Sequence, residues 1–173
     1  TIEKEKVTGL PVVPSITAML LRLKHFPSSR LSSLRYITNT GAFWPETHIR
    51  TLLRVLPNVR IFSMYGLTEC KRVAFLPPEL IDTAPGSVGG PMPTCETMLL
   101  HESGRSAGSG ETGELVVRGS NVMQGYWNDA AASDPVFRAG RYPADRILHT
   151  GDWFRLGEDG WLYFVGRRDD IIK

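Results

Sequence analysis

The chain is poor in the features that mark several classes of protein. Only two of its 173 residues are cysteine, too few for a disulfide framework, and they lack the spacing of metal ligands. Lysine and arginine are scattered and the net charge is only +2, which argues against nucleic acid as a partner. No apolar run is long enough to be a transmembrane segment. These absences favour a globular protein in a reducing compartment, and we expect a cytoplasmic location.

The first half of the chain predicts alternating strands and helices. Residues 34–38 and 59–62 are β-rich and predict strands, and residues 7–14 form a short extended apolar run. Ser15 is a candidate N-cap for a helix from residue 16 to about Lys24, and Pro45 opens a second helix. Apolar residues three and four apart give each helix one apolar face: Ile16, Met19, Leu20 and Leu23 in the first, and Ile49, Leu52, Leu53 and Leu56 in the second. This order predicts an α/β fold, a parallel sheet with crossover helices.

The second half changes in character. Glycine and proline become frequent after residue 77, and short β-rich runs at 96–101, 114–117, 146–154 and 161–165 replace the helical periods. Residues 101–104 and 157–160 are typical of hairpin turns. We therefore divide the chain into an α/β part over residues 1–93 and a β-rich, distorted-barrel-like lobe over residues 94–173.

A compact group of chemically useful residues follows the predicted strand at residues 59–62. Tyr65 offers a ring on which a planar base can stack, and Gly66 allows a close backbone approach. Thr68 can donate a hydrogen bond to an anionic oxygen, and Glu69 can hold a magnesium ion. Ligands of open α/β sheets bind at the carboxyl ends of strands, so this group predicts a ligand site. The alternative is a plain turn with a solvated threonine and glutamate.

Three later stretches make the pattern specific. They are residues 113–119 continuing to Gly125-Tyr126-Trp127, then Thr150-Gly151-Asp152, and finally residues 166–173. Taken together and in this order, the chain from about residue 40 to its end resembles the adenylate-forming superfamily, which includes acyl-CoA synthetases and the adenylation domains of nonribosomal peptide synthetases. The resemblance implies that the parent protein joins a carboxylic acid to ATP and then transfers the acyl group to a thiol such as that of coenzyme A.

The resemblance also implies roles for individual residues. Tyr65 would stack on the adenine, with Gly66 beside it, and Gly41 and Ala42 would line the adenine and acyl side through their backbone. Thr68 would contact the α-phosphate, and Glu69 would coordinate Mg²⁺.

The later motifs carry further implied roles. Asp152 would accept hydrogen bonds from the two ribose hydroxyls, with Arg167 on the same sugar. That pairing is chemically sound, because a carboxylate accepts from vicinal hydroxyls and a guanidinium keeps it ionised. Asp169 matches the hinge about which the small C-terminal domain of the family rotates. Lys173 matches a lysine used in the second half-reaction.

The chain departs from the family pattern in places. His149 stands where the family more often has tyrosine or phenylalanine, which affects the packing expected there. Neither the Gly- and Ser/Thr-rich phosphate loop nor the C-terminal domain with the catalytic lysine of the family occurs in the sequence. We therefore expect a piece of a longer protein, the later part of a large N-terminal domain, that is inactive by itself.

Two features of the expected function stay open at the level of sequence. The thiol could belong to coenzyme A, which we favour, or to the phosphopantetheine of a carrier protein, and a non-catalytic nucleotide-binding module is a third reading. The acyl-side segments 12–14 and 73–75 are apolar, which favours a fatty or aromatic acid over an amino acid, because an amino acid would need a buried carboxylate for its ammonium group.

Overall fold

The computed structural model describes residues 1–23, 28–140, 142 and 145–170. Contacts divide the chain into two compact units. The first unit comprises residues Thr1–Tyr65 and Phe75–Ser87, and the second comprises Gly66–Ala74 and Val88–Lys173. The division near residue 93 inferred from the sequence concerns domains of the parent protein and stays a prediction.

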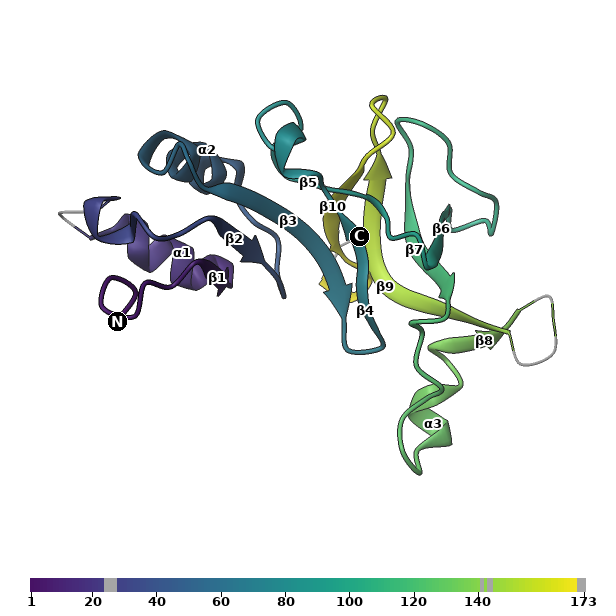
Figure 1. Cartoon of the computed structure of the whole chain (residues 1–173). Helices are drawn as coiled ribbons and strands as arrows, with labels where there is room; N and C mark the ends of the chain where they lie inside the picture. Colours follow the sequence, from purple (N-terminus) through teal and green to yellow (C-terminus); the bar gives the residue numbers. More distant parts are fainter. Residues whose placement is uncertain (24–27, 141, 143–144, 171–173) are drawn as a thin grey trace. The chain divides into compact units, whose positions relative to one another are not determined.

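The first unit contains a parallel sheet. Its strands are β1 (Gly9–Val12), β2 (Tyr36–Asn39) and β3 (Arg60–Leu67), with β1 parallel to β2 and β2 parallel to β3. Helix α1 (Pro14–Leu21) connects β1 to β2, and α2 (Glu46–Val55) connects β2 to β3 (Figure 1). Two 3₁₀ turns, η1 (Ser28–Leu31) and η2 (Pro78–Leu80), complete the unit. The predicted strand, helix, strand order of an α/β fold is confirmed.

The two helices bury their residues for different reasons. In α2 the predicted apolar face is confirmed, since Ile49 and Leu52 are buried. In α1 the helix begins at Pro14 after Val13, without a side-chain cap, so the prediction of Ser15 as N-cap is wrong. Thr17 is the residue that α1 buries, whereas Met19 is 69% exposed. Apolar residues surround most of α1, so their spacing does not select one face, and tertiary packing decides instead. Lys24, at the end of the predicted helix, lies outside the described residues.

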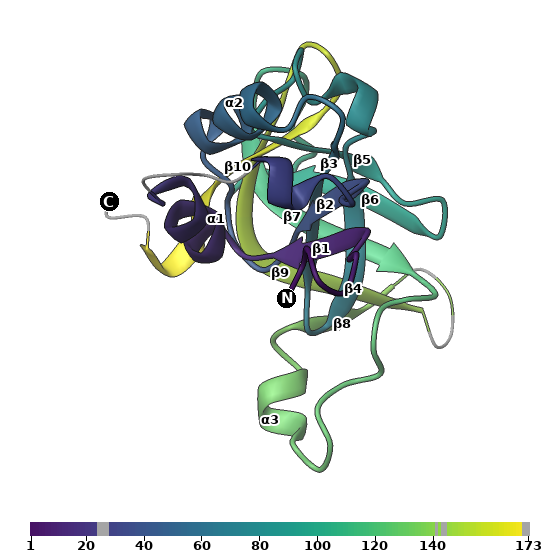
Figure 2. The ribbon, with the colours of Figure 1, turned by 60° about the vertical axis from the view of Figure 1, so that its left-hand side comes forward.

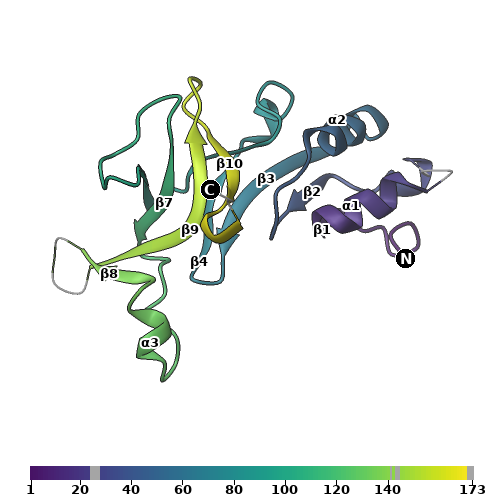
Figure 3. The same ribbon diagram turned by 180° about the vertical axis from the view of Figure 1, so that it is seen from behind.

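The second unit is built on a mainly antiparallel sheet (Figure 3). Its strands are β4 (Cys70–Phe75), β5 (Ser87–Pro91), β6 (Cys95–Leu100), β7 (Thr112–Gly119), β8 (Phe137–Ala139), β9 (Arg146–Leu156) and β10 (Leu162–Arg167). They are neighbours in the order β4-β5-β10-β9-β7-β6, and β8 pairs with β9. Among the described strands of this unit, the order begins at β4 and ends at β6, so the lobe is an open sheet and not a closed barrel.

Strand β9 organises the second unit. It pairs antiparallel with β7, β8 and β10, and it alternates buried and half-buried residues along its length. Leu148 and Phe154 are fully buried in it, and Thr150 and Asp152 are buried polar residues. Helix α3 (Ala130–Ser133) and β8 lie at one end of this unit (Figure 2). A short turn, η3 (Arg168–Asp170), follows β10.

Strand β5 shows why some strands were missed in the sequence. It reads Ser-Val-Gly-Gly-Pro, a composition typical of a turn. A Cβ at Gly90 would lie 3.1 Å from the ring of Trp161, so the glycine allows the indole to pack on the strand.

No helix in the described part of the chain has the length and apolar character needed to cross a membrane.

Candidate functional site

Thr68 and Glu69 form the two-residue turn that joins β3 to β4. The polar group predicted at a strand exit is therefore the tip of a hairpin, and this tip belongs to the second unit. Thr68 is exposed and Glu69 is half-buried. The exposed hydroxyl can donate a hydrogen bond to an anionic ligand, and the carboxylate beside it can bind the cation that accompanies that ligand.

Gly66 fits the hairpin because the opposite strand comes very close. A Cβ at this position would lie 2.6 Å from the backbone nitrogen of Arg72 and 3.2 Å from its Cα. Arg72 has a φ of 61°, a left-handed conformation that is uncommon for a residue with a side chain. Gly66 thus permits a distorted hairpin whose tip carries Thr68 and Glu69.

A loop after β7 holds Glu69 from outside the hairpin. The hydroxyl of Tyr126 donates a hydrogen bond to Oε1 of Glu69, and the backbone N–H of Met123 donates to the carbonyl oxygen of Glu69 at 2.9 Å. The bond to Glu69 raises the pKa of Tyr126 to about 12. Tyr126 lies in a stretch that carried the family resemblance, but its pairing with Glu69 was not predicted, because 57 residues separate the two in sequence.

Asp152 and Arg167 face each other on neighbouring strands. They are opposite residues in the antiparallel pairing of β9 with β10, and Nη1 of Arg167 lies 3.1 Å from Oδ1 of Asp152. The side chain of Asp152 is only 6% exposed, whereas that of Arg167 is 55% exposed. The structure therefore brings together the two residues that the sequence predicted to act on one ribose.

Glu114 on β7 supports the part of β9 that precedes Asp152. Nδ1 of His149 lies 3.3 Å from Oε2 of Glu114, and the N–H of Gly151 donates to Oε1 of Glu114 at 3.2 Å. The hydrogen bond with His149 lowers the pKa of Glu114 more than its burial raises it. The residue that departs from the family pattern, His149, thus has a carboxylate partner of its own, and this pair fixes the approach to Asp152.

The remaining predicted residues belong to the first unit, to η3 or to the part of the chain outside the description. Gly41, Ala42 and Tyr65 belong to the first unit, where Nδ2 of Asn39 donates to the carbonyl oxygen of Ala42 at 3.0 Å and so orders the end of β2. Gly41 has a φ of 87°, which suits glycine. Asp169 lies in η3, and its side chain is not described. Lys173 lies outside the described residues.

Glu69 offers a single carboxylate at an exposed turn. Among the described residues there is no group of three or more His, Cys, Asp or Glu side chains that could hold a metal. Mg²⁺ keeps several waters and is commonly bound by one or two carboxylates together with substrate phosphates. Glu69 at an exposed turn, beside the hydroxyl of Thr68, fits that mode of binding.

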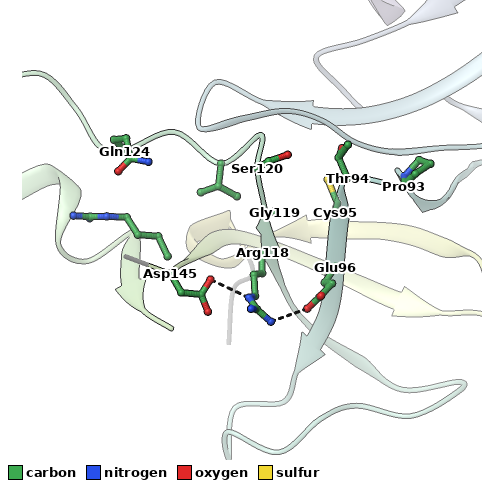
Figure 4. Close-up of a pocket in the computed structure, with 11 residues that line it drawn as sticks. Pro93, Thr94, Cys95, Glu96, Arg118, Gly119, Ser120, Gln124 and Asp145 are labelled. Carbon is green, nitrogen blue, oxygen red and sulfur yellow. Dashed lines mark hydrogen bonds and ion pairs between the residues drawn. The ribbon is translucent and has the colours of Figure 1, made fainter. Parts of the chain in front are cut away.

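A polar pocket of about 440 Å³ lies elsewhere in the second unit (Figure 4). Its lining includes Arg118, which bridges Glu96 and Asp145 at 3.1 and 2.9 Å, and the thiol of Cys95. None of the residues that the sequence predicted for the nucleotide or metal lines it. Three of its charged residues, Glu96, Arg118 and Asp145, are paired with one another.

Comparison with known proteins shows the family of this chain. The model of the AMP-binding enzyme family matches residues 1–127, and the chain belongs to that family. It is 35% identical to an indoleacetate–CoA ligase of Aromatoleum aromaticum over 172 residues, which cover 99% of this chain and 32% of that protein.

Two further relatives agree with this assignment. A long-chain-fatty-acid–CoA ligase of Salmonella typhimurium is 33% identical over 171 residues, covering 99% of this chain and 29% of that protein. The structure of O-succinylbenzoate coenzyme A synthetase (MenE) from Bacillus subtilis in complex with ATP and a magnesium ion matches with a TM-score of 0.79 and 31% identity, covering 99% of this chain and 34% of that one. The chain thus spans about a third of the length of these relatives.

Proposed function

We propose that the whole protein to which this chain belongs is an AMP-forming acid–CoA ligase. It would join a carboxylic acid to ATP, giving an acyl-adenylate and pyrophosphate, and then transfer the acyl group to the thiol of coenzyme A. The observation that carries this proposal is the turn Thr68-Glu69 in the same unit as the Asp152–Arg167 pair, in a chain of the AMP-binding enzyme family. The proposal includes a cytoplasmic location, where ATP and coenzyme A are at hand.

The proposed chemistry is mainly electrostatic. Attack of a carboxylate on the α-phosphate brings two anions together, so donors and cations must offset their repulsion. Thr68 would donate to the α-phosphate, and Glu69 would hold Mg²⁺, which neutralises phosphate charge when bound. Asp152 would bind the ribose hydroxyls, and its partner Arg167 would keep it ionised. Tyr65, Gly66, Gly41 and Ala42 would serve the adenine and acyl side, and Asp169 and Lys173 the hinge and second half-reaction.

For the acid we propose a fatty or aromatic compound. The names of the relatives include indoleacetate and long-chain fatty acid, and the segment before α1 is apolar, with Val13 38% exposed. Val73 and Ala74 support a contact with the acid less than their apolar sequence implied, because both side chains are buried in β4. The parts of the relatives that this chain does not cover are expected to supply the rest of the acid pocket.

The test is ATP–pyrophosphate exchange by the whole protein with a panel of fatty, aromatic and amino acids, followed by addition of coenzyme A. Exchange with one class of acid and then thioester formation is the expected result. Exchange without a coenzyme A thioester would indicate a carrier-protein thiol. No exchange with any acid would refute the ligase and leave a non-catalytic nucleotide-binding module.

Substitutions at the turn sharpen the test. Thr68→Ala is expected to slow exchange roughly ten- to a hundred-fold, the cost of losing one hydrogen bond to a charged group. Glu69→Ala is expected to lose more, because it removes the metal ligand. Unchanged exchange in Glu69→Ala would remove the role proposed for that residue.

A further inference from the structure

We propose that Tyr126 is a positioning residue for the metal site. The loop from Gly125 to Ser133 holds the hydroxyl of Tyr126 against the carboxylate of Glu69. This inference rests on the proposed function, since it assigns Glu69 to Mg²⁺. It adds a residue that lies on neither strand of the hairpin.

The segment just before this loop makes a second, backbone connection to the hairpin. Val122 forms an isolated antiparallel bridge with Cys70, the residue after Glu69, and the N–H of Met123 donates to the carbonyl oxygen of Glu69. Asn121 strengthens the connection, since its Nδ2 donates to the carbonyl oxygen of Arg72 at 3.2 Å. The segment that leads into the loop is therefore fixed to the hairpin before the chain reaches Tyr126.

Ser133 fixes the far end of the same loop. Its hydroxyl accepts from the N–H of Tyr126 at 2.9 Å and donates to the carbonyl oxygen of Asp129 at 2.6 Å. Ser133 is 7% exposed, so water competes little for these bonds. Gly125 has a φ of 142°, and a Cβ there would lie 3.0 Å from the Ser133 hydroxyl. The backbone of Tyr126 is thus held on both sides.

The ring of Tyr126 is also supported. It packs edge-on against Phe137, with 6.0 Å between ring centroids, and Phe137 is 4% exposed in β8. With backbone and ring both fixed, the hydroxyl can restrain Oε1 of Glu69, leaving Oε2 to face a cation. A glutamate that is ordered in advance loses less conformational entropy when it binds a metal.

The experiment compares metal binding and activity in variants of the whole protein. Mn²⁺ replaces Mg²⁺ as the probe, and its affinity in the presence of ATP is measured by electron paramagnetic resonance, without any acid. Tyr126→Phe is expected to weaken Mn²⁺ binding about tenfold, the effect of freeing one glutamate side chain. Ser133→Ala is expected to weaken it less, because it loosens the loop but keeps the hydroxyl.

Tyr163→Phe is the matched control. Tyr163 also donates its hydroxyl to a carboxylate, Oδ2 of Asp159 at 2.6 Å, but that pair lies at the hairpin between β9 and β10. The control is expected to bind Mn²⁺ with the affinity of the unaltered protein. Tyr126→Phe should regain exchange activity when the concentration of Mg²⁺ is raised.

The outcomes separate this inference from the proposed function. Unchanged or tighter Mn²⁺ binding by Tyr126→Phe would overturn the positioning role, even in a protein that exchanges pyrophosphate normally. Equal weakening by Tyr163→Phe would also overturn it, because the effect would then follow from general loss of stability. A protein that activates no acid, yet binds Mn²⁺ with ATP in a manner that depends on Tyr126, would refute the ligase and support the positioning role.

Discussion

Replacing Gly66 by alanine tests whether the geometry of the hairpin matters for the chemistry proposed at its tip. The added Cβ would lie 2.6 Å from the backbone nitrogen of Arg72, and ordinary contact begins at 3.4 Å, so the strands must separate by about 0.8 Å. The obstacle is backbone, which cannot rotate away as a side chain can. The turn that carries Thr68 and Glu69 begins only two residues further along the chain.

The expected cost has two parts. Overpacking of this kind destabilises a protein by about 1–3 kcal/mol. A displacement of about 1 Å at a reacting group can slow a reaction about a hundred-fold. Gly66→Ala is therefore expected to lower the melting temperature modestly and to slow ATP–pyrophosphate exchange by about one to two orders of magnitude.

The assay is exchange by the whole protein at temperatures where the variant is fully folded, as checked by circular dichroism. Gly108→Ala is the matched control, because a Cβ there meets only the carboxylate of Glu111, at 3.8 Å. The control should match the unaltered protein in both measurements. Full exchange activity in a stably folded Gly66→Ala protein would refute the argument that this close approach positions the turn.

Three further predictions concern other parts of the second unit. Asp152→Asn keeps the shape of the side chain but removes the charge that pairs with Arg167 at 3.1 Å; we expect about tenfold or more weaker ATP binding by calorimetry, and unchanged affinity would contradict the ribose role. The pKa of Glu114 is lowered in the folded state, so its contribution to stability should be full above a pH of about 4.3 and be lost as the pH falls further; thermal melts of Glu114→Gln should show a shallower acid loss than those of the unaltered protein. Burial raises the pKa of the Cys70 thiol to about 12, and Cys70 is fully buried while Cys95 lines a pocket. Iodoacetamide at pH 8 should therefore alkylate Cys95 first. Mass spectrometry showing Cys70 labelled first would contradict this.

The parts of the fold that could be predicted are those in which local sequence and final structure agree. Helix α2 has a regular apolar spacing and an opening proline, and the structure buries its predicted face. Strands β2, β3, β7 and β9 each contain a β-rich run that the sequence predicts. In β3, β7 and β9 the strand continues beyond the predicted run. In α2 and β9 the buried residues recur with the period of the element, whereas β7 buries three consecutive residues, Leu115 to Val117.

The parts that were missed depend on contacts between distant residues. Strand β4 follows β3 after only two residues, and its sequence, Cys-Lys-Arg-Val-Ala-Phe, contains two charges and no regular alternation. Tyr126 meets Glu69 across 57 residues, and no spacing rule connects them. His149 could be recognised as unusual for the family, but its partner Glu114 lies on another strand and could be found only in the folded chain.

The two restraints on Glu69 have different origins. The backbone of the turn is set by the approach of Gly66 to Arg72, and the carboxylate is set by Tyr126; all four residues belong to the second unit. Gly41 and Ala42, proposed for the acyl side, belong to the first unit.

The contacts that restrain Glu69 all lie within the second unit, so a substitution at Gly41 or Ala42 is expected to leave them in place. The same reasoning predicts where variation is costly: at Gly66, where any side chain meets backbone, and at Tyr126, where only a phenol reaches the carboxylate.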